Sequence, residues 1–362
     1  MTRGVAAPGR LVDRLPTPTQ GAVTHAPRLL LLGCGGVGRA FLQRLQQRGE
    51  STPLLGVANS RRALIGPDGT SLSIADRALE RAPRRPPTST LIGLLHPGDI
   101  VVDATASAEL ATQHPNWLAR GVNIVTANKL GRGGTLARHR AISDACLQHG
   151  VGYGDAATVG AGLPFLRTLR ALRAGGDRIL SISGLLSGTL GWLLDGYDGQ
   201  QPFSARVQEA RRQGITEPDP RSDLSGEDVK RKLLILLRSA GFELESDAVH
   251  VKPLLGLEEG HGDLDRRIDK ATVRAATRGG VLRYVARFDP EAGASVGLEI
   301  LERDDPLANS GSDNALQIRS CRYDQKPLLL QGPGAGTAIS AAALLDDVRN
   351  LLAAEPLAST VR

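Results

Sequence analysis

Residues 29–38 read LLLLGCGGVG. Four consecutive leucines are typical of a short strand buried on both faces, and an amphipathic segment at 39–48 follows the glycines. A glycine pattern placed between a strand and a helix predicts dinucleotide binding. Gly33 permits the tight turn, Gly35 lets the backbone approach a pyrophosphate, and Gly38 lets the helix pack closely on the strand. The helix N-terminus then offers N–H groups to the phosphates.

Strand and helix signals alternate through the first 150 residues. Apolar runs at 54–58, 100–104 and 122–126 predict further strands, and helices are predicted near 74–81, 107–120 and 135–149. This alternation is typical of a parallel sheet with helices on both faces. We therefore predict an α/β fold with a Rossmann-type, doubly wound parallel sheet.

The pattern changes after about residue 150. Helices are predicted from 160–164 toward 172, at 203–213 and at 228–240, and strands at 178–186, 281–288 and 295–301. A glycine-rich segment at 332–336 precedes an apolar helix from about 338 to 352. We predict a second, α+β domain at 156–331 that binds the substrate, and a dinucleotide-binding domain at 28–155 plus about 332–356. Residues 1–27 predict a disordered tail, with a transit peptide as the alternative.

The end of the second predicted strand bears on the choice of cofactor. An acidic residue there binds the ribose 2′-hydroxyl of NAD, whereas Arg accommodates the 2′-phosphate of NADP. Asn59, Ser60, Arg61 and Arg62 follow this strand, with no acid among them. This favours NADP over NAD, and two solvated surface arginines are the alternative. We expect the cofactor to contact also the residues after the other strands and the glycine-rich segment: Gly36, Val37, Thr105, Ala106, Ser107, Lys129 and Gly336.

Lysine is scarce in this chain, at six positions among 44 basic residues. Because Arg is used wherever a positive charge suffices, a lysine here is a candidate for a role that needs a titratable group. Lys129 ends the sequence TANK at 126–129, directly after a predicted strand, where ligands sit in open α/β sheets. We expect its ammonium group to hydrogen-bond a substrate oxygen or to transfer a proton, and a surface lysine is the alternative.

The segment TEPDPRSDLSGEDVKRK at 216–232 is rich in carboxylates and then becomes apolar. Two prolines rigidify the loop that carries Glu217 and Asp223. Ser225 is a candidate helix cap, and Asp228 and Lys232 lie four residues apart on one helical face. Lys232 borders an apolar stripe and is expected to be partly buried, while the neighbouring residues 230 and 231 reach water. A capping box with an ordinary helical ion pair is the structural alternative.

Composition excludes several classes of function. Aromatic residues make up only 3% of the chain, and the Arg residues are scattered, which argues against nucleic-acid binding despite the net charge of +6. No apolar run is long enough to span a bilayer, so we predict no membrane partner. Cys34, Cys146 and Cys321 lack paired or metal-type spacing, which predicts a reducing, cytoplasmic location. The histidines have no ligand spacing either, and each is predicted to be structural or at the surface.

These motifs together resemble homoserine dehydrogenase, particularly the dehydrogenase half of the bifunctional aspartokinase–homoserine dehydrogenases. The resemblance extends from about residue 28 to 355. It rests on residues 32–38, VVDAT at 101–105, TANK at 126–129, TVGAGLP at 158–164, LSGTL at 186–190, GAGT at 334–337 and, most specifically, 216–232.

The resemblance implies a substrate and a set of site residues. The family interconverts L-aspartate 4-semialdehyde and L-homoserine, in threonine and methionine biosynthesis, with hydride from NAD(P)H. It implies that Lys129 and Lys232 lie at the reacting oxygen with exchangeable roles, beside Asp228. It also implies that the substrate is held by Glu217, Asp223, Asp228, Gly188 and Thr189. A homodimer formed through the second domain is implied as well, and a sodium ion on the backbone carbonyls of Val159 and Ala161 is a weaker implication.

The sequence departs from the family's pattern in three respects. We expect no aspartokinase portion and no C-terminal regulatory domain, and hence no feedback inhibition by threonine. Ala156 stands where the family often has an acid near the sodium site, with Asp155 one position earlier. Two other readings stay open: a non-catalytic dinucleotide-binding sensor, and an aspartate-semialdehyde dehydrogenase, which needs a nucleophilic cysteine that none of the three resembles.

Overall fold

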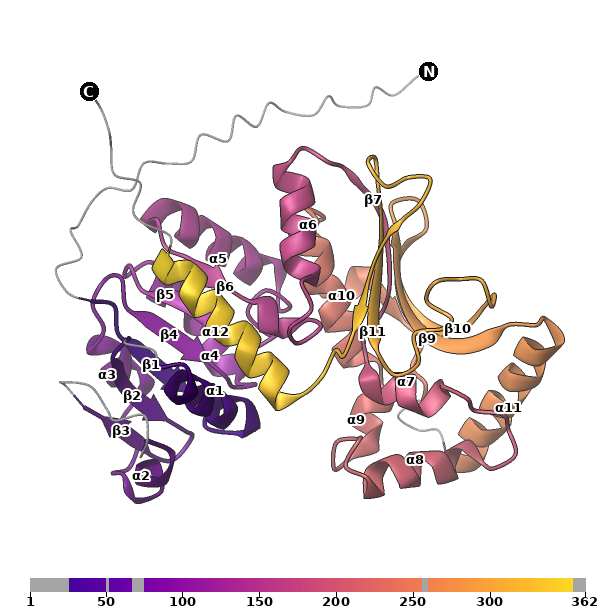
Figure 1. Ribbon diagram of the computed structural model, residues 1–362, viewed down its shortest axis with the longest axis horizontal. Coiled ribbons are helices and arrows are strands. Elements are labelled where there is room, and N and C mark those ends of the chain that lie inside the picture. Colours follow the sequence, from indigo (N-terminus) through magenta and orange to yellow (C-terminus); the bar gives the residue numbers. More distant parts are fainter. Residues whose placement is uncertain (1–25, 50–51, 67–74, 256–259, 354–362) are drawn as a thin grey trace.

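The computed structural model describes residues 26–49, 52–66, 75–255 and 260–353, and these form two sheets with helices packed around each (Figure 1). The predicted N-terminal tail lies almost entirely outside the described residues. Within them, no helix is long and apolar enough to cross a membrane.

The first sheet contains six strands in the order β3-β2-β1-β4-β5-β6. Its strands are β1 (Leu29–Leu32), β2 (Leu54–Ala58), β3 (Ala63–Ile65), β4 (Ile100–Asp103), β5 (Asn123–Thr126) and β6 (Tyr153–Gly154). All neighbouring pairs are parallel except β2 with β3, which are antiparallel. The prediction of a doubly wound parallel sheet is therefore confirmed. It omitted β3 and β6, because two or three residues give no periodic signal.

Helices cover both faces of the first sheet. One face packs on α1 (Gly36–Gln47), α2 (Ala75–Arg81) and α12 (Thr337–Ala353), and the other on α3 (Thr88–Gly93), α4 (Ala108–Leu118) and α5 (Leu136–His149). Successive residues of β1 alternate between these two cores: Leu29 and Leu31 face the first, Leu30 and Leu32 the second. Because both faces are buried, the strand sequence is uniformly apolar rather than alternating.

The last helix brings the end of the chain back to the first sheet, where it packs beside α1 (Figure 1). Residues 341–348 of α12 contribute Ala341, Leu344, Leu345 and Val348 to the core shared with α1. At its N-terminus, Thr337 lies so close to Gly36 that a Cβ at that glycine would come within 2.8 Å of the Thr337 methyl group.

The second sheet also has six strands, in the order β12-β11-β7-β9-β10-β8. Its strands are β7 (Ile179–Leu185), β8 (Val249–Val251), β9 (Val281–Asp289), β10 (Gly293–Leu301), β11 (Asn314–Ser320) and β12 (Leu328–Gly332). All pairs are antiparallel except β10 with β8. This mixed sheet agrees with the predicted α+β character of the second half.

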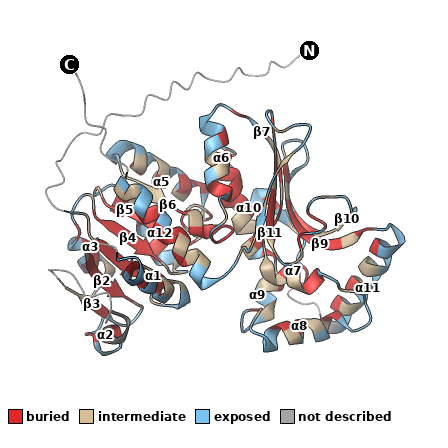
Figure 2. Ribbon diagram, in the orientation of Figure 1, coloured by how far each residue is buried: buried red, intermediate tan, exposed pale blue. Residues whose placement is uncertain are grey.

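One face of the second sheet carries most of the remaining helices. They are α6 (Phe165–Ala174), α7 (Gly188–Leu194), α8 (Phe203–Arg212), α9 (Pro220–Leu224), α10 (Glu227–Ser239) and α11 (His261–Thr277), and all of them contribute to a single large apolar core. Figure 2 shows the buried residues concentrated in the strands and along the inner face of these helices. Helix α10 lies between the two sheets and is buried on nearly all sides, from Leu233 to Leu237.

Candidate functional site

The turn from β1 into α1 has the geometry of a phosphate-binding loop. Gly33 adopts φ +98°, and a Cβ at Gly38 would lie 1.9 Å from the carbonyl oxygen of Gly33. A Cβ at Gly35 would meet no atom within 4 Å. Helix α1 begins at Gly36 without a side-chain cap, so its first N–H groups keep their hydrogen-bonding capacity. This open, uncapped N-terminus fits the pyrophosphate of a dinucleotide.

The residues predicted to contact the cofactor come together along one edge of the first sheet. Parallel strands place their carboxyl ends on the same side. The turn after β1, residues 59–61 after β2, residues 105–107 after β4 and Lys129 after β5 therefore meet at that edge. Gly336 joins them from the segment before α12, next to Thr337 and the start of α1.

A buried hydrogen-bond network holds the ends of β4 and β5 at this edge. Asp103 is fully buried, and its carboxylate accepts hydrogen bonds from the Thr105 hydroxyl at 2.6 Å and from the Asn128 amide at 3.0 Å. The Asn128 amide also donates to the carbonyl oxygen of Ser107 at 2.8 Å. The network ties residues 105–107 to the backbone immediately before Lys129.

His114 extends this network away from the surface. Its Nε2 lies 3.1 Å from Asp103 Oδ2, and its Nδ1 lies 3.0 Å from the hydroxyl of Tyr153. His114 is fully buried, and burial raises the pKa of Tyr153 well above its usual value. Because the ring is satisfied on both nitrogens inside the core, His114 is a structural histidine, as predicted.

Lys129, Asp228 and Lys232 form one charged cluster between the two sheets. Lys129 Nζ lies 3.4 Å from Asp228 Oδ1, and Lys232 Nζ lies 2.9 Å from Asp228 Oδ2. Lys232 also donates to the carbonyl oxygen of Leu186 at 2.7 Å. The Lys232 side chain is 13% exposed and that of Lys129 is 33% exposed. One carboxylate therefore holds two ammonium groups at a site that solvent reaches.

The charge state of Asp228 follows from its neighbours. The surrounding protein raises its pKa by desolvation, but the positive charges and hydrogen bonds of Lys232 and Lys129 outweigh this and lower the pKa to about 2. Asp228 is therefore ionised throughout the neutral range and neutralises one of the two lysines. A net positive charge remains beside an ionised carboxylate, which suits a site that develops negative charge on a substrate oxygen.

The predicted acidic loop lies next to this cluster. Asp223 Oδ2 accepts a hydrogen bond from the backbone N–H of Glu217 at 2.9 Å, and Thr189 hydrogen-bonds both Asp223 and the carbonyl oxygen of Ile215. Burial, Glu217 and Asp228 raise the pKa of Asp223. Among the described residues, neither Asp223 nor Glu217 forms an ion pair. These two carboxylates thus lie close together without a basic partner.

Helix α7 places the other two predicted substrate residues beside this loop. Gly188 is its first residue and Thr189 its second, after the N-cap Ser187, whose side chain accepts from the backbone of Leu190. The carbonyl oxygen of Leu186, which Lys232 contacts, immediately precedes this cap. The segment 186–189 therefore contacts both the lysine cluster and the acidic loop.

Two local predictions about this segment were wrong. The N-cap of α10 is Gly226 rather than Ser225: Gly226 adopts φ +76°, and a Cβ there would lie 2.1 Å from the Tyr284 hydroxyl. Ser225 instead accepts from the backbone of Glu227 and donates to Ser222. Lys230 does not reach freely into water either. Its side chain is 18% exposed, close to the 13% of Lys232.

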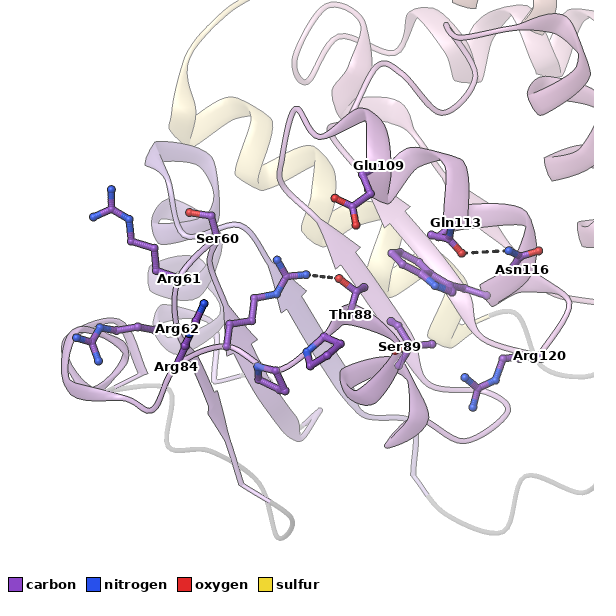
Figure 3. A pocket seen from close by; sticks show the side chains of 15 residues that line it. Ser60, Arg61, Arg62, Arg84, Thr88, Ser89, Glu109, Gln113, Asn116 and Arg120 are labelled. Carbon is purple, nitrogen blue, oxygen red and sulfur yellow. Dashed lines mark hydrogen bonds between the residues drawn. The ribbon is translucent and has the colours of Figure 1, made fainter.

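An arginine-lined cleft of about 1340 Å³ opens beside the carboxyl end of β2 (Figure 3). Arg61, Arg62 and Arg84 lie on one side of it and Arg120 on the other. Asn59 shapes this rim, because its side chain accepts from the backbone N–H groups of residues 61 and 62 at 2.8 Å each. The cleft is lined by one carboxylate, Glu109, and by five arginines: Arg61, Arg62, Arg84, Arg85 and Arg120. This surplus of positive charge suits a phosphorylated ligand.

The predicted sodium site lies in the turn before α6. Val159 is fully buried, and Ala161 adopts φ +53°. The one carboxylate close by in sequence, Asp155, is 1% exposed and pairs with Arg170 at 2.7 Å and Arg132 at 3.3 Å. In the described chain no group of three metal-ligating side chains occurs. The residues present fit a cation poorly, since two guanidinium groups already neutralise Asp155.

The cysteines do not form a nucleophilic site. Cys34 lies in the glycine turn and Cys321 is exposed. Burial raises the pKa of Cys146 to about 11, so its thiol stays protonated at neutral pH. This arrangement offers no support for thioester chemistry.

The contacts of several residues that shape the site could not be predicted from the sequence. Asp103 lies in VVDAT and Asn128 in TANK, but the hydrogen bond between them forms only because β4 and β5 are neighbouring strands. The carbonyl oxygen of Leu186 is a backbone group, which no residue pattern identifies.

Comparison with known proteins covers both halves of the chain. Residues 33–151 match the family model described as homoserine dehydrogenase, NAD binding domain, and residues 164–348 match the model described as homoserine dehydrogenase. Homoserine dehydrogenase of Saccharomyces cerevisiae is 34% identical, over 90% of this chain and 98% of the yeast protein.

Two further relatives differ in extent. Bifunctional aspartokinase/homoserine dehydrogenase 2 of Escherichia coli is 40% identical over 89% of this chain, which spans only 43% of that protein's length. The crystal structure of a putative homoserine dehydrogenase from Archaeoglobus fulgidus shares the fold, with a TM-score of 0.78, 23% identity and coverage of 90% of this chain and 99% of that one.

Proposed function

Because the chain belongs to the homoserine dehydrogenase family, we propose that it reduces L-aspartate 4-semialdehyde reversibly to L-homoserine with NAD(P)H, in threonine and methionine biosynthesis. The observation that carries the proposal is the carboxylate of Asp228 held between Lys129 and Lys232. Reduction of an aldehyde needs a hydride donor, a proton donor at the oxygen and groups that orient the substrate. The cluster and its surroundings supply the last two.

The two lysines are the proposed proton donors to the reacting oxygen. An alkoxide forms as hydride reaches the aldehyde carbon, and an ammonium group beside it both stabilises the charge and donates a proton. Two of the three N–H bonds of Lys232 are directed at Asp228 and Leu186, which fixes the ammonium group and leaves one N–H for the substrate. Lys129 faces the same carboxylate from the cofactor side, so either lysine can deliver the proton.

The acidic loop is the proposed binding site for the substrate's ammonium group. Asp223 and Glu217 carry like charges close together, and the raised pKa of Asp223 reflects burial and that repulsion. An amino-acid ammonium group placed between them removes the repulsion. Asp228 contributes from the other side, and Gly188 and Thr189 from helix α7. This arrangement favours an α-amino aldehyde over an aldehyde without an ammonium group.

The proposed cofactor site extends from the glycine turn to the arginine-lined cleft. When bound, the reduced dinucleotide supplies the hydride. The pyrophosphate would lie on Gly33, Gly35, Gly36, Val37 and Gly38, with residues 105–107, Lys129 and Gly336 around the nicotinamide end. Arg61, in a cleft with a surplus of arginines, supports NADP over NAD, because a guanidinium group pairs well with a 2′-phosphate.

The proposal includes the architecture and the assembly of the enzyme. Residues 28–155 with about 332–356 would form the dinucleotide-binding domain, and 156–331 the substrate-binding domain, through which the chain would form a homodimer. Cys34, Cys146 and Cys321, all within the described residues, form no disulfide, which supports a cytoplasmic location. No step is assigned to sodium, since Val159 and Ala161 offer only backbone carbonyls there.

The test is to incubate the protein with NADPH and L-aspartate 4-semialdehyde and to identify the product by mass spectrometry. Formation of homoserine in proportion to NADPH consumed supports the proposal. Binding of NADPH without consumption of this aldehyde, and no oxidation of homoserine in the reverse direction, would contradict it and indicate a dinucleotide-binding sensor instead.

A further inference from the structure

Arg238 is a buried arginine at the end of α10 whose hydrogen bonds go almost entirely to backbone carbonyl groups. Its side chain is 0% exposed. Nη1 donates to the carbonyl oxygens of Arg132 and Gly134, at 2.5 and 2.8 Å, and Nε and Nη2 donate to that of Leu244, at 3.2 and 2.8 Å. The nearest carboxylate oxygen, on Glu245, is 3.9 Å away. Arg238 thus binds the main chain that follows Lys129.

The segment that Arg238 binds is packed directly against α10. It runs from Lys129 to Thr135 and contains three glycines. A Cβ at Gly133 would lie 2.6 Å from the carbonyl oxygen of Lys129, 2.7 Å from the Arg231 side chain and 3.0 Å from Ile235. The backbone N–H of Gly133 also donates to the carbonyl oxygen of Lys129 at 2.8 Å. Any displacement of this segment from α10 therefore moves the backbone of Lys129.

Helix α10 carries the partners of Lys129 at its other end. Asp228 and Lys232 lie in its first two turns, and Arg238 lies in its last. The same helix thus fixes the carboxylate that binds the Lys129 ammonium group and the main chain from which Lys129 extends. We propose that Arg238 is a positioning residue, which sets the separation of Lys129 from Asp228 and Lys232 by holding the carbonyl groups of Arg132 and Gly134.

A guanidinium group is suited to this role. Its planar fork presents several donors in fixed directions, whereas a lysine ammonium group cannot reach three carbonyl oxygens in different directions. Burial lowers the pKa of Arg238 to about 10, so the group remains charged at neutral pH. Glu245 holds the main chain directly after this segment, since its carboxylate accepts a hydrogen bond from the backbone N–H of Leu136 at 3.0 Å.

The inference rests on the proposed function and has a direct kinetic consequence. A misplacement of about 1 Å in a reacting group lowers the rate by roughly 100-fold. We expect Arg238→Met to lower kcat for L-aspartate 4-semialdehyde by about 10- to 100-fold. The KM for NADPH should stay within about twofold, because the hydrogen bonds of Arg238 go to Arg132, Gly134 and Leu244 and not to the glycine turn or the arginine cleft. Arg238→Lys should restore part of kcat.

Arg173→Met is the control for loss of an arginine–carbonyl bond at this end of α10. Arg173 is exposed and donates a hydrogen bond to the carbonyl oxygen of Ser239 at 3.2 Å, not to residues 130–134. Its replacement removes a comparable arginine–carbonyl bond and should leave kcat within about twofold. Gly133→Ala perturbs the same contact from the other side and should reproduce the loss of kcat, which keeps the test valid if Arg238→Met folds poorly.

The decisive comparison introduces Arg238→Met into Lys129→Ala and measures single-turnover NADPH oxidation. If Arg238 acts through Lys129, the second substitution lowers the rate no further. If the two losses multiply, or if Arg238→Met and Gly133→Ala behave like Arg173→Met, the inference is wrong. If the unmodified protein does not reduce the aldehyde at all, the proposed function fails and the inference fails with it.

Discussion

Lys129 and Asp228 approach to 3.4 Å although one follows a strand of the first sheet and the other begins a helix that packs on the second. The ion pair therefore lies where the two halves of the molecule meet. The cofactor edge of the first sheet and the acidic loop of the second half both border it. A hydride donor held on one side and an amino aldehyde held on the other would meet at these two residues.

The first prediction separates two glycines of the β1–α1 turn. Gly38→Ala places a Cβ 1.9 Å from the carbonyl oxygen of Gly33, so the helix must move from the strand and the melting temperature should fall by several degrees. Gly35→Ala meets no protein atom and should leave the melting temperature unchanged. Its methyl group occupies the face proposed for the pyrophosphate, so the Kd for NADPH should rise at least about tenfold. Thermal unfolding and fluorescence titration measure the two effects, and tight NADPH binding by Gly35→Ala would contradict the proposed phosphate site.

The second prediction concerns the choice between NADP and NAD. Arg61→Ala should raise the KM for NADPH by roughly 10- to 100-fold, as expected for loss of a hydrogen bond between charged groups, and should leave the KM for NADH nearly unchanged. Arg48→Ala, which removes an exposed charge at the far end of α1, is the control for long-range electrostatics. Equal effects of Arg61→Ala on both cofactors would rule out a 2′-phosphate contact.

The third prediction follows from the lowered pKa of Asp228. The pKa of Asp228 is about 2 in the folded protein, against 3.8 for an aspartate free of these neighbours in the unfolded chain. The ionised carboxylate therefore stabilises the fold above about pH 4, and this contribution is lost as the pH falls toward 2. Asp228→Asn should therefore lower the free energy of unfolding at pH 6, and the difference from the unmodified protein should shrink toward pH 2. Urea unfolding at several pH values measures it, with the exposed Asp144→Asn as control. A difference that stays constant with pH would contradict the ion pairs.

The fourth prediction tests the buried network below the cofactor edge. His114→Ala leaves a cavity and removes a partner of the buried Asp103 carboxylate, so the free energy of unfolding should fall by about 3 kcal/mol. His149→Ala, at the exposed end of α5, should change it by less than about 0.5 kcal/mol. Equal stability of the two variants would show that the network contributes little.

Much of this architecture was predictable because its signals are local. The leucine run and the glycines at 33, 35 and 38 predict the first strand, turn and helix, and the predicted helix at 135–149 is Leu136–His149. Strand β3 and helix α9 were missed, since three to five residues carry no clear periodicity. Strands β11 and β12, of seven and five residues, and helix α11, of 17 residues, were missed as well.

In the candidate site, too, contacts within one helix were predictable and contacts between the two sheets were not. The sequence places Asp228 and Lys232 four residues apart on one helix, which predicts their contact. Their approach to Lys129 depends on how two sheets pack, and no spacing encodes it. Arg238 is a further case: it reads as one more arginine in a chain that has many, and only its burial and its bonds to Arg132 and Gly134 distinguish it.

The role of the lysine cluster is tested most directly by NADPH oxidation followed at 340 nm with L-aspartate 4-semialdehyde, for the unmodified protein and for Lys232→Ala, with NADPH binding measured in parallel. We expect rapid turnover by the unmodified protein and a loss of at least about 100-fold in the variant at unchanged NADPH affinity. Turnover by Lys232→Ala at the unmodified rate would contradict the proposed role of the lysine cluster around Asp228.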